Sequence, residues 1–163
     1  MKTLFRASKD WPYHVSSGCV VVRKNADQLK ILLLHRDANF AKRDVDSYHL
    51  PKGTVEANEP LEHAAVREVE EESGQPVRII GYLGGVHSEF TNPYVNEHWD
   101  RVVHYFVAMP TRKATLATDH EHSGAAWFSI PEALKHLEQN PKQEKMIVER
   151  ALQYIDTFGL KPQ

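Results

Sequence analysis

The segment His49–Gly74, HLPKGTVEANEPLEHAAVREVEEESG, limits what this chain can be more than any other stretch. It holds seven acidic residues, and Glu68, Glu71 and Glu72 fall within little more than one turn of a predicted helix. Each helical residue turns the chain by about 100°, so these three side chains point into one sector. Carboxylates that close raise one another's pKa and are costly to keep together without a cation. The segment therefore predicts either a solvated acidic face or a cation site.

The ends of this helix are marked by its sequence. Asn58 or Glu59 can cap the start, and Gly74 fits a C-terminal stop. Ala64 and Ala65 lie one turn before the carboxylates in the same sector, so we expect no bulky side chain to shield the acids. Oxygen ligands of this kind suit hard divalent ions, and Mg²⁺ or Mn²⁺ is the expected cation.

The rest of the chain alternates between strand-like and helix-like stretches. Compact apolar or β-branched runs predict strands at residues 15–24, 29–36, 77–90, 101–109 and 125–129. The SIPE sequence at 129–132 is a capping box that begins a helix, and a last amphipathic helix is predicted over 142–158. That helix is expected to be scaffold, with core side chains at helical spacing: Met146, Ile147, Ala151 and Ile155.

These elements predict an α/β domain with a mixed sheet and helices on both sides. The sequence divides into an N-terminal arm, a folded domain and a short tail, at residues 1–12, 13–158 and 159–163. With 163 residues, 41% apolar and 26% charged, the chain reads as one globular domain. The loop between the predicted strands 77–90 and 101–109, at residues 91–99, is expected to lack regular structure.

Charge and cysteine content exclude several classes of protein. A net charge of −2 argues against a broad nucleic-acid surface. Cys19 is the only cysteine, so a disulfide within the chain and a cysteine-rich zinc site are both excluded, and we expect its thiol to be buried. No secretory segment opens the sequence and no apolar run reaches membrane length, so a cytoplasmic setting and no membrane partner are expected.

The acidic segment resembles the Nudix box, whose form is Gly-x5-Glu-x7-Arg-Glu-aliphatic-x-Glu-Glu-x-Gly-aliphatic. Gly53 and Glu59 have the required spacing, and REVEEESG at 67–74 supplies the remainder. Only the last position departs from the pattern, because Gln75 stands where the box has an aliphatic residue. The resemblance implies the Nudix fold, an α/β/α sandwich around a mixed sheet, with its box at 53–75. It also implies hydrolysis of a nucleoside diphosphate linked to another group.

The same resemblance implies a metal site. On that interpretation Mg²⁺, or Mn²⁺ in its place, is bound by the side chains of Glu68, Glu71 and Glu72. The main-chain carbonyl of Lys52 is implied as a further ligand. The resemblance also implies that Arg67 orients the carboxylates.

Catalytic roles are implied for the same part of the sequence. Glu59 is expected to support the loop before the helix. Glu68 is the expected general base, and Glu72 is the alternative. Water would attack phosphorus while metal neutralises charge on the bridging and leaving oxygens.

Two further stretches resemble asymmetric diadenosine tetraphosphate hydrolases of the animal and archaeal type. LPKGTVE at 50–56 is similar to their PKGHVE, although Thr54 replaces the histidine, and it implies that Lys52 and Gly53 meet phosphate. PYVNEHWDRVVHYF at 93–106 is similar to a segment in which a loop tyrosine stacks on adenine. That likeness implies stacking by Tyr94 and phosphate binding by Arg101, with Trp99 and Phe40 as weaker stacking candidates.

A third stretch, DHEHSGAAWFS at 119–129, resembles the subfamily's His-Glu-His sequence followed by tryptophan. It implies that Glu121 approaches the metal from a separate loop. His120 and His122 are expected at the surface or behind the metal ligands, because no thiol accompanies them and the carboxylates already define a hard site.

The predicted function is Mg²⁺-dependent hydrolysis of diadenosine tetraphosphate to ATP and AMP. The alternatives are a (d)NTP, an oxidised nucleotide or an RNA 5′ end as substrate, and, in a different class, a Nudix-fold binding module without catalysis. An inositol pyrophosphate is disfavoured because the candidate cations are few: Lys42, Arg43, Lys52, Arg101, Arg112 and Lys113.

Overall fold

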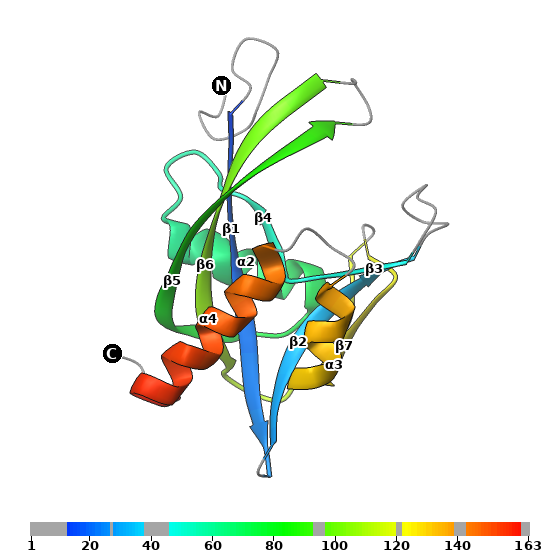
Figure 1. Cartoon of the computed structure of the whole chain (residues 1–163), viewed down its shortest axis with the longest axis vertical. Coiled ribbons are helices and arrows are strands. Elements are labelled where there is room, and N and C mark those ends of the chain that lie inside the picture. The colour runs from blue at the N-terminus through cyan, green and yellow to red at the C-terminus, as the bar shows by residue number, and fades with distance from the viewer. Residues whose placement is uncertain are drawn as a thin grey trace.

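The computed structural model describes residues 13–26, 28–37, 46–92, 97–119, 122–138 and 143–160. The proposed N-terminal arm lies outside the described residues, as do Phe40, Tyr94, His120 and Glu121. Within the described part, a long twisted sheet carries helices on its faces (Figure 1).

A mixed sheet forms the centre of the molecule. Its main path runs β3-β2-β1-β6-β5, with β4 added to β1 and β7 added to β2. The pair β1 and β6 is parallel, whereas the other pairs are antiparallel. The strands are β1 (Tyr13–Asn25), β2 (Gln28–Arg36), β3 (Ser47–His49), β4 (Lys52–Thr54), β5 (Val77–Asn92), β6 (Glu97–Pro110) and β7 (Gly124–Ser129).

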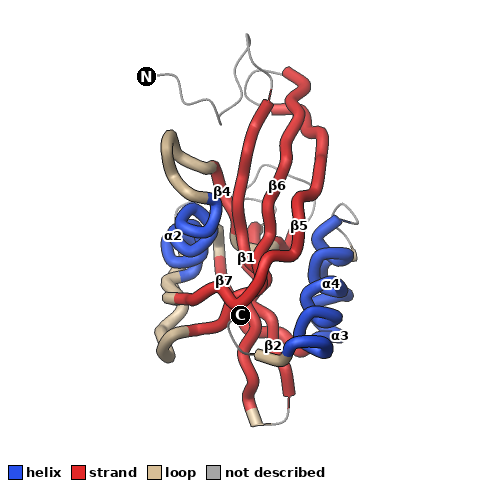
Figure 2. Tube along the Cα trace, turned by 90° about the vertical axis from the view of Figure 1, so that its left-hand side faces the viewer, coloured by secondary structure: helices blue, strands red, loops and turns tan. Residues whose placement is uncertain are grey.

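Three described helices cover the two faces of the sheet. Helix α2 (Leu61–Ser73) lies on one face, and α3 (Ile130–Leu137) and α4 (Gln143–Phe158) lie on the other (Figure 2). This arrangement confirms the predicted α/β architecture with a mixed sheet between helices. No helix among the described residues is long and apolar enough to cross a membrane.

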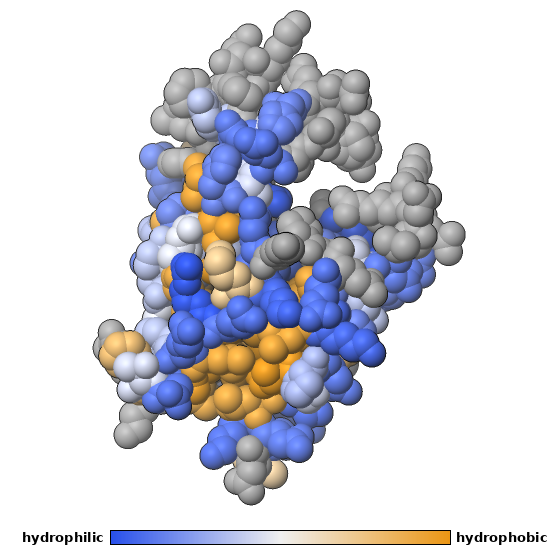
Figure 3. All heavy atoms as spheres, in the orientation of Figure 1, coloured by the Kyte–Doolittle hydropathy of each residue, from blue (hydrophilic) through white to orange (hydrophobic). Residues whose placement is uncertain are grey.

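Alternation along the strands produces two cores. On β1, Val20 and Val22 belong to the core beneath α3 and α4, whereas Cys19 and Val21 belong to the core beneath α2. The predicted burial of Cys19 is therefore confirmed. On the α3 and α4 face, apolar side chains gather between the two helices (Figure 3). Met146 is 40% exposed, so its predicted place in the core is wrong.

The ends of the predicted elements differ from those observed. The acidic helix was predicted to start at Glu59. The observed helix α2 begins two residues later, at Leu61, with Pro60 as its N-cap. Part of the predicted loop at 91–99 is wrong, because residues 91–92 belong to β5 and residues 97–99 to β6 in antiparallel pairing, whereas residues 93–96 lie outside the described residues. Pairing along a long partner strand keeps residues 97–99 extended, although their local propensity favours a loop. The extension places Trp99 in the same strand as Arg101, for which a strand was already predicted.

Candidate functional site

Helix α2 presents the acidic cluster at the edge of the sheet. Ala64, Ala65 and Val69 are fully buried, and the Ser17 hydroxyl donates to the Leu61 carbonyl at 2.7 Å. The two small alanines therefore also let the helix approach the sheet closely. At the other end Gly74 has φ of 69°, a left-handed conformation that suits glycine.

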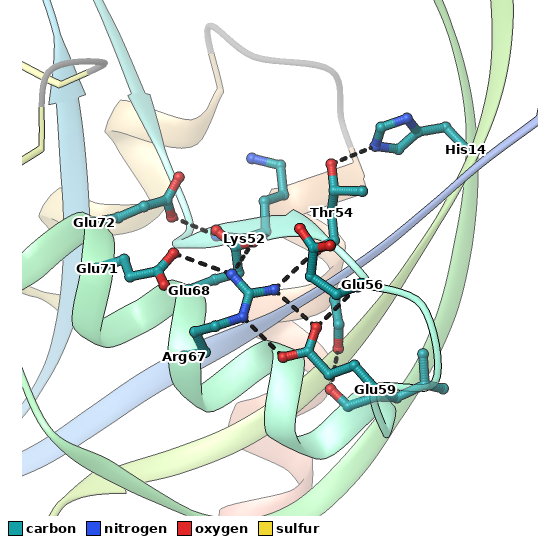
Figure 4. A network of polar contacts seen from close by, with 11 residues as sticks. His14, Lys52, Thr54, Glu56, Glu59, Arg67, Glu68, Glu71 and Glu72 are labelled. Carbon is teal, nitrogen blue, oxygen red and sulfur yellow. Dashed lines mark hydrogen bonds and ion pairs between the residues drawn. The ribbon is translucent and has the colours of Figure 1, made fainter. Parts of the chain in front are cut away.

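Arg67 organises the acidic cluster (Figure 4). Its Nε and Nη2 donate to the two Glu59 carboxylate oxygens at 2.8 and 2.9 Å. Its Nη1 donates to Glu68 at 2.8 Å and to Glu71 at 3.0 Å, and Nη2 also donates to the Thr54 carbonyl at 3.0 Å. One guanidinium thus joins three carboxylates to the preceding loop, as a planar fork of donors can. These neighbouring carboxylates raise the pKa of Arg67.

Glu59 also supports the loop that leads into the helix. Its Oε2 accepts the Glu56 N–H at 2.9 Å, while both of its oxygens accept from Arg67. The Arg67 hydrogen bond, acting against burial, lowers the pKa of Glu59. The structure therefore gives Glu59 the contacts that a loop-supporting residue needs.

Gly53 lies directly against the carboxylate of Glu68. A Cβ built on Gly53 would stand 2.1 Å from that carboxylate, which is far inside any real contact distance. Because Gly53 has no side chain, β4 leaves room for the carboxylate of Glu68. Burial raises the pKa of Glu68, although Arg67 opposes the shift.

Glu72 is the most buried of the three predicted metal ligands. Its side chain is 10% exposed, compared with 13% for Glu68 and 58% for Glu71. One oxygen accepts the main-chain N–H of Lys52 at 2.8 Å. Burial raises its pKa to about 8, against the opposing charge of Lys52. Without a metal ion, this carboxyl group therefore keeps a proton at neutral pH.

The raised pKa of Glu72 predicts how the metal-free chain responds to pH. The folded chain binds this proton more tightly than the unfolded chain, in which a glutamate titrates near 4.5. The free energy of unfolding contributed by this group therefore falls as pH rises from about 4.5 to 8. We expect Glu72→Gln to remove most of that fall, about 3 kcal/mol, measured by denaturant unfolding in EDTA at about pH 5.5 and 8.5. Glu70→Gln, on the exposed side of α2, is the control, and an equal pH dependence in both variants would contradict the assignment.

A second set of side chains meets Glu72 from the loop before β7. His122 is buried, and its Nδ1 lies 2.9 Å from an oxygen of Asp119. Because a carboxylate only accepts, Nδ1 carries the proton, and Nε2 is left to accept from Arg36 Nη2 at 3.3 Å. The same Nε2 lies 3.8 Å from Glu72. Burial lowers the pKa of His122, which agrees with a neutral ring.

Two groups among the described residues bring three potential metal-ligand atoms within 4.8 Å of one another. One group is Glu72 with Asp119 and His122, and the other is an exposed cluster on β5 and β6. The predicted trio of box carboxylates is not among them, because Glu68 and Glu71 turn toward Arg67. His122 is therefore buried beside Glu72, a predicted metal ligand, and is not at the surface.

The chemistry of the box still fits a hard divalent ion. It offers carboxylate oxygens from Glu68, Glu71 and Glu72, two of which are buried with raised pKa values. A cation of charge +2 would relieve the repulsion and desolvation that raise those values. The oxygen donors fit Mg²⁺ or Mn²⁺ better than a soft metal.

A cavity of about 510 Å³ opens beside the acidic cluster. One wall is β6, where alternate residues Trp99, Arg101, Val103 and Tyr105 all face the cavity, as the two-residue period of a strand requires. The Arg101 Nε donates to the Ser88 hydroxyl at 3.2 Å. Other lining residues come from β4, α2, the segment before β7, and α4. They are Lys52, Gly53, Glu72, His122 and Glu144.

Cations concentrate on this cavity more than the sequence suggested. Lys52 and Arg101, both predicted to bind substrate, line it together with Arg36. The imidazoles of His14, His49 and His122 also line it, although the His122 ring is neutral and adds no positive charge. The cavity thus combines an acidic corner with a basic wall, which suits a polyphosphate held against a metal ion.

A family model described as NUDIX domain matches residues 12–149. The chain belongs to the NUDIX domain family. A Bacillus subtilis (strain 168) protein named "Putative 8-oxo-dGTP diphosphatase" is 30% identical over 114 residues, which cover 70% of this chain and 66% of that protein. A Caenorhabditis elegans relative, "Putative nudix hydrolase 1", is 30% identical over 67 residues. The matched residues make up 41% of this chain but only 18% of that protein.

Solved structures share the fold of this Nudix chain. A C. elegans Ap4A hydrolase binary complex has a TM-score of 0.68 at 21% identity, covering 88% of this chain and 98% of that one. The MutT protein of Methanosarcina mazei Go1 has a TM-score of 0.64 at 26% identity, covering 88% and 95%. The predicted Nudix fold and the resemblance to Ap4A hydrolases are therefore confirmed.

The structure brings together most of the predicted site residues and leaves two unplaced. Glu59, Arg67 and Glu68 form one hydrogen-bonded group, and Lys52 joins Glu72. Tyr94 and Glu121 fall outside the described residues, so their roles stay predictions. The roles of the others are also still predictions, now supported by their positions.

Sequence reasoning missed three side chains at the site: Arg36, Asp119 and Glu144. Asp119 stands at the start of the DHEHSG stretch that was singled out, and its spacing of three from His122 was a usable signal. Nothing in the local sequence marks Arg36 or Glu144. Both reach the cavity only because the fold brings β2 and α4 beside the box.

Proposed function

We propose that this Nudix chain is a divalent-metal-dependent pyrophosphohydrolase of nucleoside polyphosphates. The observation that carries the proposal is the Arg67 group, which fixes Glu59 and Glu68 beside a cavity lined by Lys52 and Arg101. A binding module without catalysis would not need buried carboxylates with raised pKa values at this corner. The names of the relatives in this family also favour a hydrolase.

The proposed metal ligands are Glu68, Glu71, Glu72 and the main-chain carbonyl of Lys52. Bound Mg²⁺ or Mn²⁺ would supply charge neutralisation on the phosphate oxygens. Arg67 holds Glu68 and Glu71 from behind, at 2.8 and 3.0 Å, and restricts the directions in which their carboxylates can turn. The main-chain N–H of Lys52 does the same for Glu72.

Glu68 is the proposed general base. Burial raises its pKa from the ordinary value, which makes its carboxylate a stronger proton acceptor for an attacking water. Glu72 is the alternative, since its pKa is raised further in the metal-free chain. Lys52 and Arg101 face the cavity and would hold the phosphates of the substrate.

We infer that the substrate is diadenosine tetraphosphate, cut to ATP and AMP. The cavity supports a long polyphosphate because its cations are spread from Arg36 and Lys52 to Arg101. The likeness to an Ap4A hydrolase structure points the same way. The second candidate is an oxidised or ordinary (d)NTP, favoured by the name of the Bacillus subtilis relative. An RNA 5′ end is a less favoured third.

A stacking site for the nucleobase is proposed at the outer end of β6. Trp99 lines the cavity in the same register as Arg101, so a base stacked on its ring would leave the phosphates beside the arginine. Tyr94 precedes β6 in the sequence and lies outside the described residues, and it stays a candidate for the opposite face of the base.

Replacing Trp99 is expected to weaken binding more than turnover. Trp99→Leu should raise KM by about tenfold, since base stacking is worth roughly 1–3 kcal/mol, with kcat changed much less. Tyr82→Leu is the control, because Tyr82 is an exposed aromatic on the other face of the same sheet. Steady-state kinetics that show equal KM values for wild type and Trp99→Leu would rule out stacking at this position.

The substrate is tested by product analysis. Diadenosine tetraphosphate and a set of (d)NTPs, including 8-oxo-dGTP, would be offered in parallel with Mg²⁺ and the products separated by ion-exchange chromatography. ATP plus AMP from the dinucleotide, with slow turnover of the mononucleotides, is the expected result. Nucleoside monophosphate plus pyrophosphate from a (d)NTP, with the dinucleotide intact, would assign the second candidate.

A further inference from the structure

A buried carboxylate on α4 lies behind the predicted phosphate-binding lysine. Glu144 is 7% exposed, and its Oε1 lies 2.8 Å from the ammonium of Lys52. Its Oε2 accepts the Leu50 N–H at 3.0 Å, and the Tyr105 hydroxyl donates to Oε1 at 3.4 Å. His49 Nδ1 approaches Oε2 at 3.8 Å. Neither the box nor the proposed reaction uses this group.

The environment of Glu144 requires a negative charge. Lys52 and the Leu50 N–H can only donate, and the Tyr105 hydroxyl donates here as well. Burial acts to raise the pKa of Glu144, but the charges of Lys52 and His49 and the hydrogen bonds from Lys52 and Leu50 together outweigh it, and the pKa is lowered. An amide in this place would direct two donor hydrogens at donor groups, so glutamine cannot reproduce the contacts.

Lys52 contacts two carboxylates: Glu72 through its main-chain N–H and Glu144 through its ammonium. Its main-chain N–H binds Glu72, a proposed metal ligand, and the charge of its ammonium opposes the rise in the pKa of Glu72 that burial causes. Its ammonium itself is bound to Glu144 and to the Leu50 carbonyl, at 2.8 and 3.3 Å. In Figure 4 the Lys52 side chain leaves β4 on the opposite side from Arg67. The flexible four-carbon stem of a lysine would allow another position if Glu144 were absent.

We propose that Glu144 is a positioning residue that holds the Lys52 ammonium on the nucleotide side of the cavity. Released from Glu144, the ammonium would pair with Glu72 and compete with the divalent cation for its carboxylate. Glu144 thereby lets one short turn supply both a metal-binding corner and a phosphate-binding cation. The inference rests on the proposed function in one respect, the use of Glu72 as a metal ligand.

The test is the affinity for Mn²⁺ alone, measured without nucleotide by electron paramagnetic resonance of the free ion. We expect Glu144→Gln to raise the Kd for Mn²⁺ by about tenfold, as an ammonium about 4 Å from a carboxylate would. The double variant Lys52→Met with Glu144→Gln should recover the wild-type Kd, because the competing ammonium is gone. If Glu144 had only a structural role, removing the lysine would not restore the affinity for Mn²⁺.

The controls separate folding from competition. Glu149→Gln, on the exposed side of α4, should bind Mn²⁺ as the wild type does. Glu144→Asp keeps the negative charge but shortens its reach, so it should weaken Mn²⁺ binding less than Glu144→Gln does. The aspartate variant also provides the test if the glutamine variant does not fold. Thermal unfolding followed by circular dichroism shows which variants are folded.

The outcomes distinguish this inference from the proposed function. Wild-type affinity for Mn²⁺ in Glu144→Gln, or equal loss in the single and double variants, would overturn the positioning role. Absence of Mn²⁺ binding by the wild-type chain would overturn it as well. Mn²⁺ binding with the expected pattern, but no hydrolysis of any nucleotide by the wild type, would overturn the proposed function alone.

Discussion

Replacing Glu68 with glutamine is expected to lower kcat by about 10²–10⁴-fold, the range typical for loss of a general base. The glutamine carbonyl can still accept from Arg67 Nη1, which now lies 2.8 Å from Glu68, so the side chain keeps its place. Loss of one negative charge also relieves the repulsion on the neighbouring carboxylates. Steady-state kinetics with Mg²⁺ should therefore show a folded protein with almost no turnover.

The matched control for this variant is Glu70→Gln. Glu70 is exposed on the same helix. It should keep the wild-type rate and stability. A Glu68→Gln variant with nearly wild-type kcat would move the role of base to Glu72.

The second large effect is expected from a single methyl group on Gly53. In Gly53→Ala the new Cβ would meet the Glu68 carboxylate at 2.1 Å, so that the carboxylate or the β4 turn must move. Misplacement of a reacting group by about 1 Å can cost 10²-fold, and we expect kcat/KM to fall at least that far. The extra bulk should also lower the free energy of unfolding by about 1–3 kcal/mol.

Gly85→Ala separates the local clash from a general intolerance of alanine in the sheet. A Cβ on Gly85 would have its nearest neighbours at 3.5 and 3.6 Å, which are ordinary contacts. We expect this variant to keep nearly normal kcat/KM and stability in denaturant unfolding. Similar losses in both variants would show that Glu68 does not depend on the space left by Gly53.

The local features of the fold could be predicted from the sequence. The capping box at Ser129 is present, with its side chain and that of Glu132 both in place, because such a motif is encoded within four residues. The buried strand at 29–36 and the last helix were also correct within about one residue. The spacing of Gly53, Glu59 and Arg67 likewise pointed to residues that the fold brings together.

Long-range features could not be predicted in the same way. The extension of β6 to Glu97 depends on pairing with β5, and that pairing turned a predicted loop into the strand that carries Trp99. Glu144 reads as an ordinary acid in the first turn of an amphipathic helix. Its contact with Lys52 joins residues 92 positions apart, and no periodicity in the sequence records such a contact.

The metal-dependent chemistry is tested most directly by one comparison. Wild-type chain would be incubated with diadenosine tetraphosphate and a panel of (d)NTPs, with Mg²⁺ and again after chelation by EDTA, and phosphoanhydride cleavage followed by chromatography. Cleavage of at least one nucleotide with Mg²⁺, lost in EDTA and in Glu68→Gln, is the predicted result. Cleavage that continues in EDTA, or no cleavage of any nucleotide with Mg²⁺ or Mn²⁺, would contradict the proposed function.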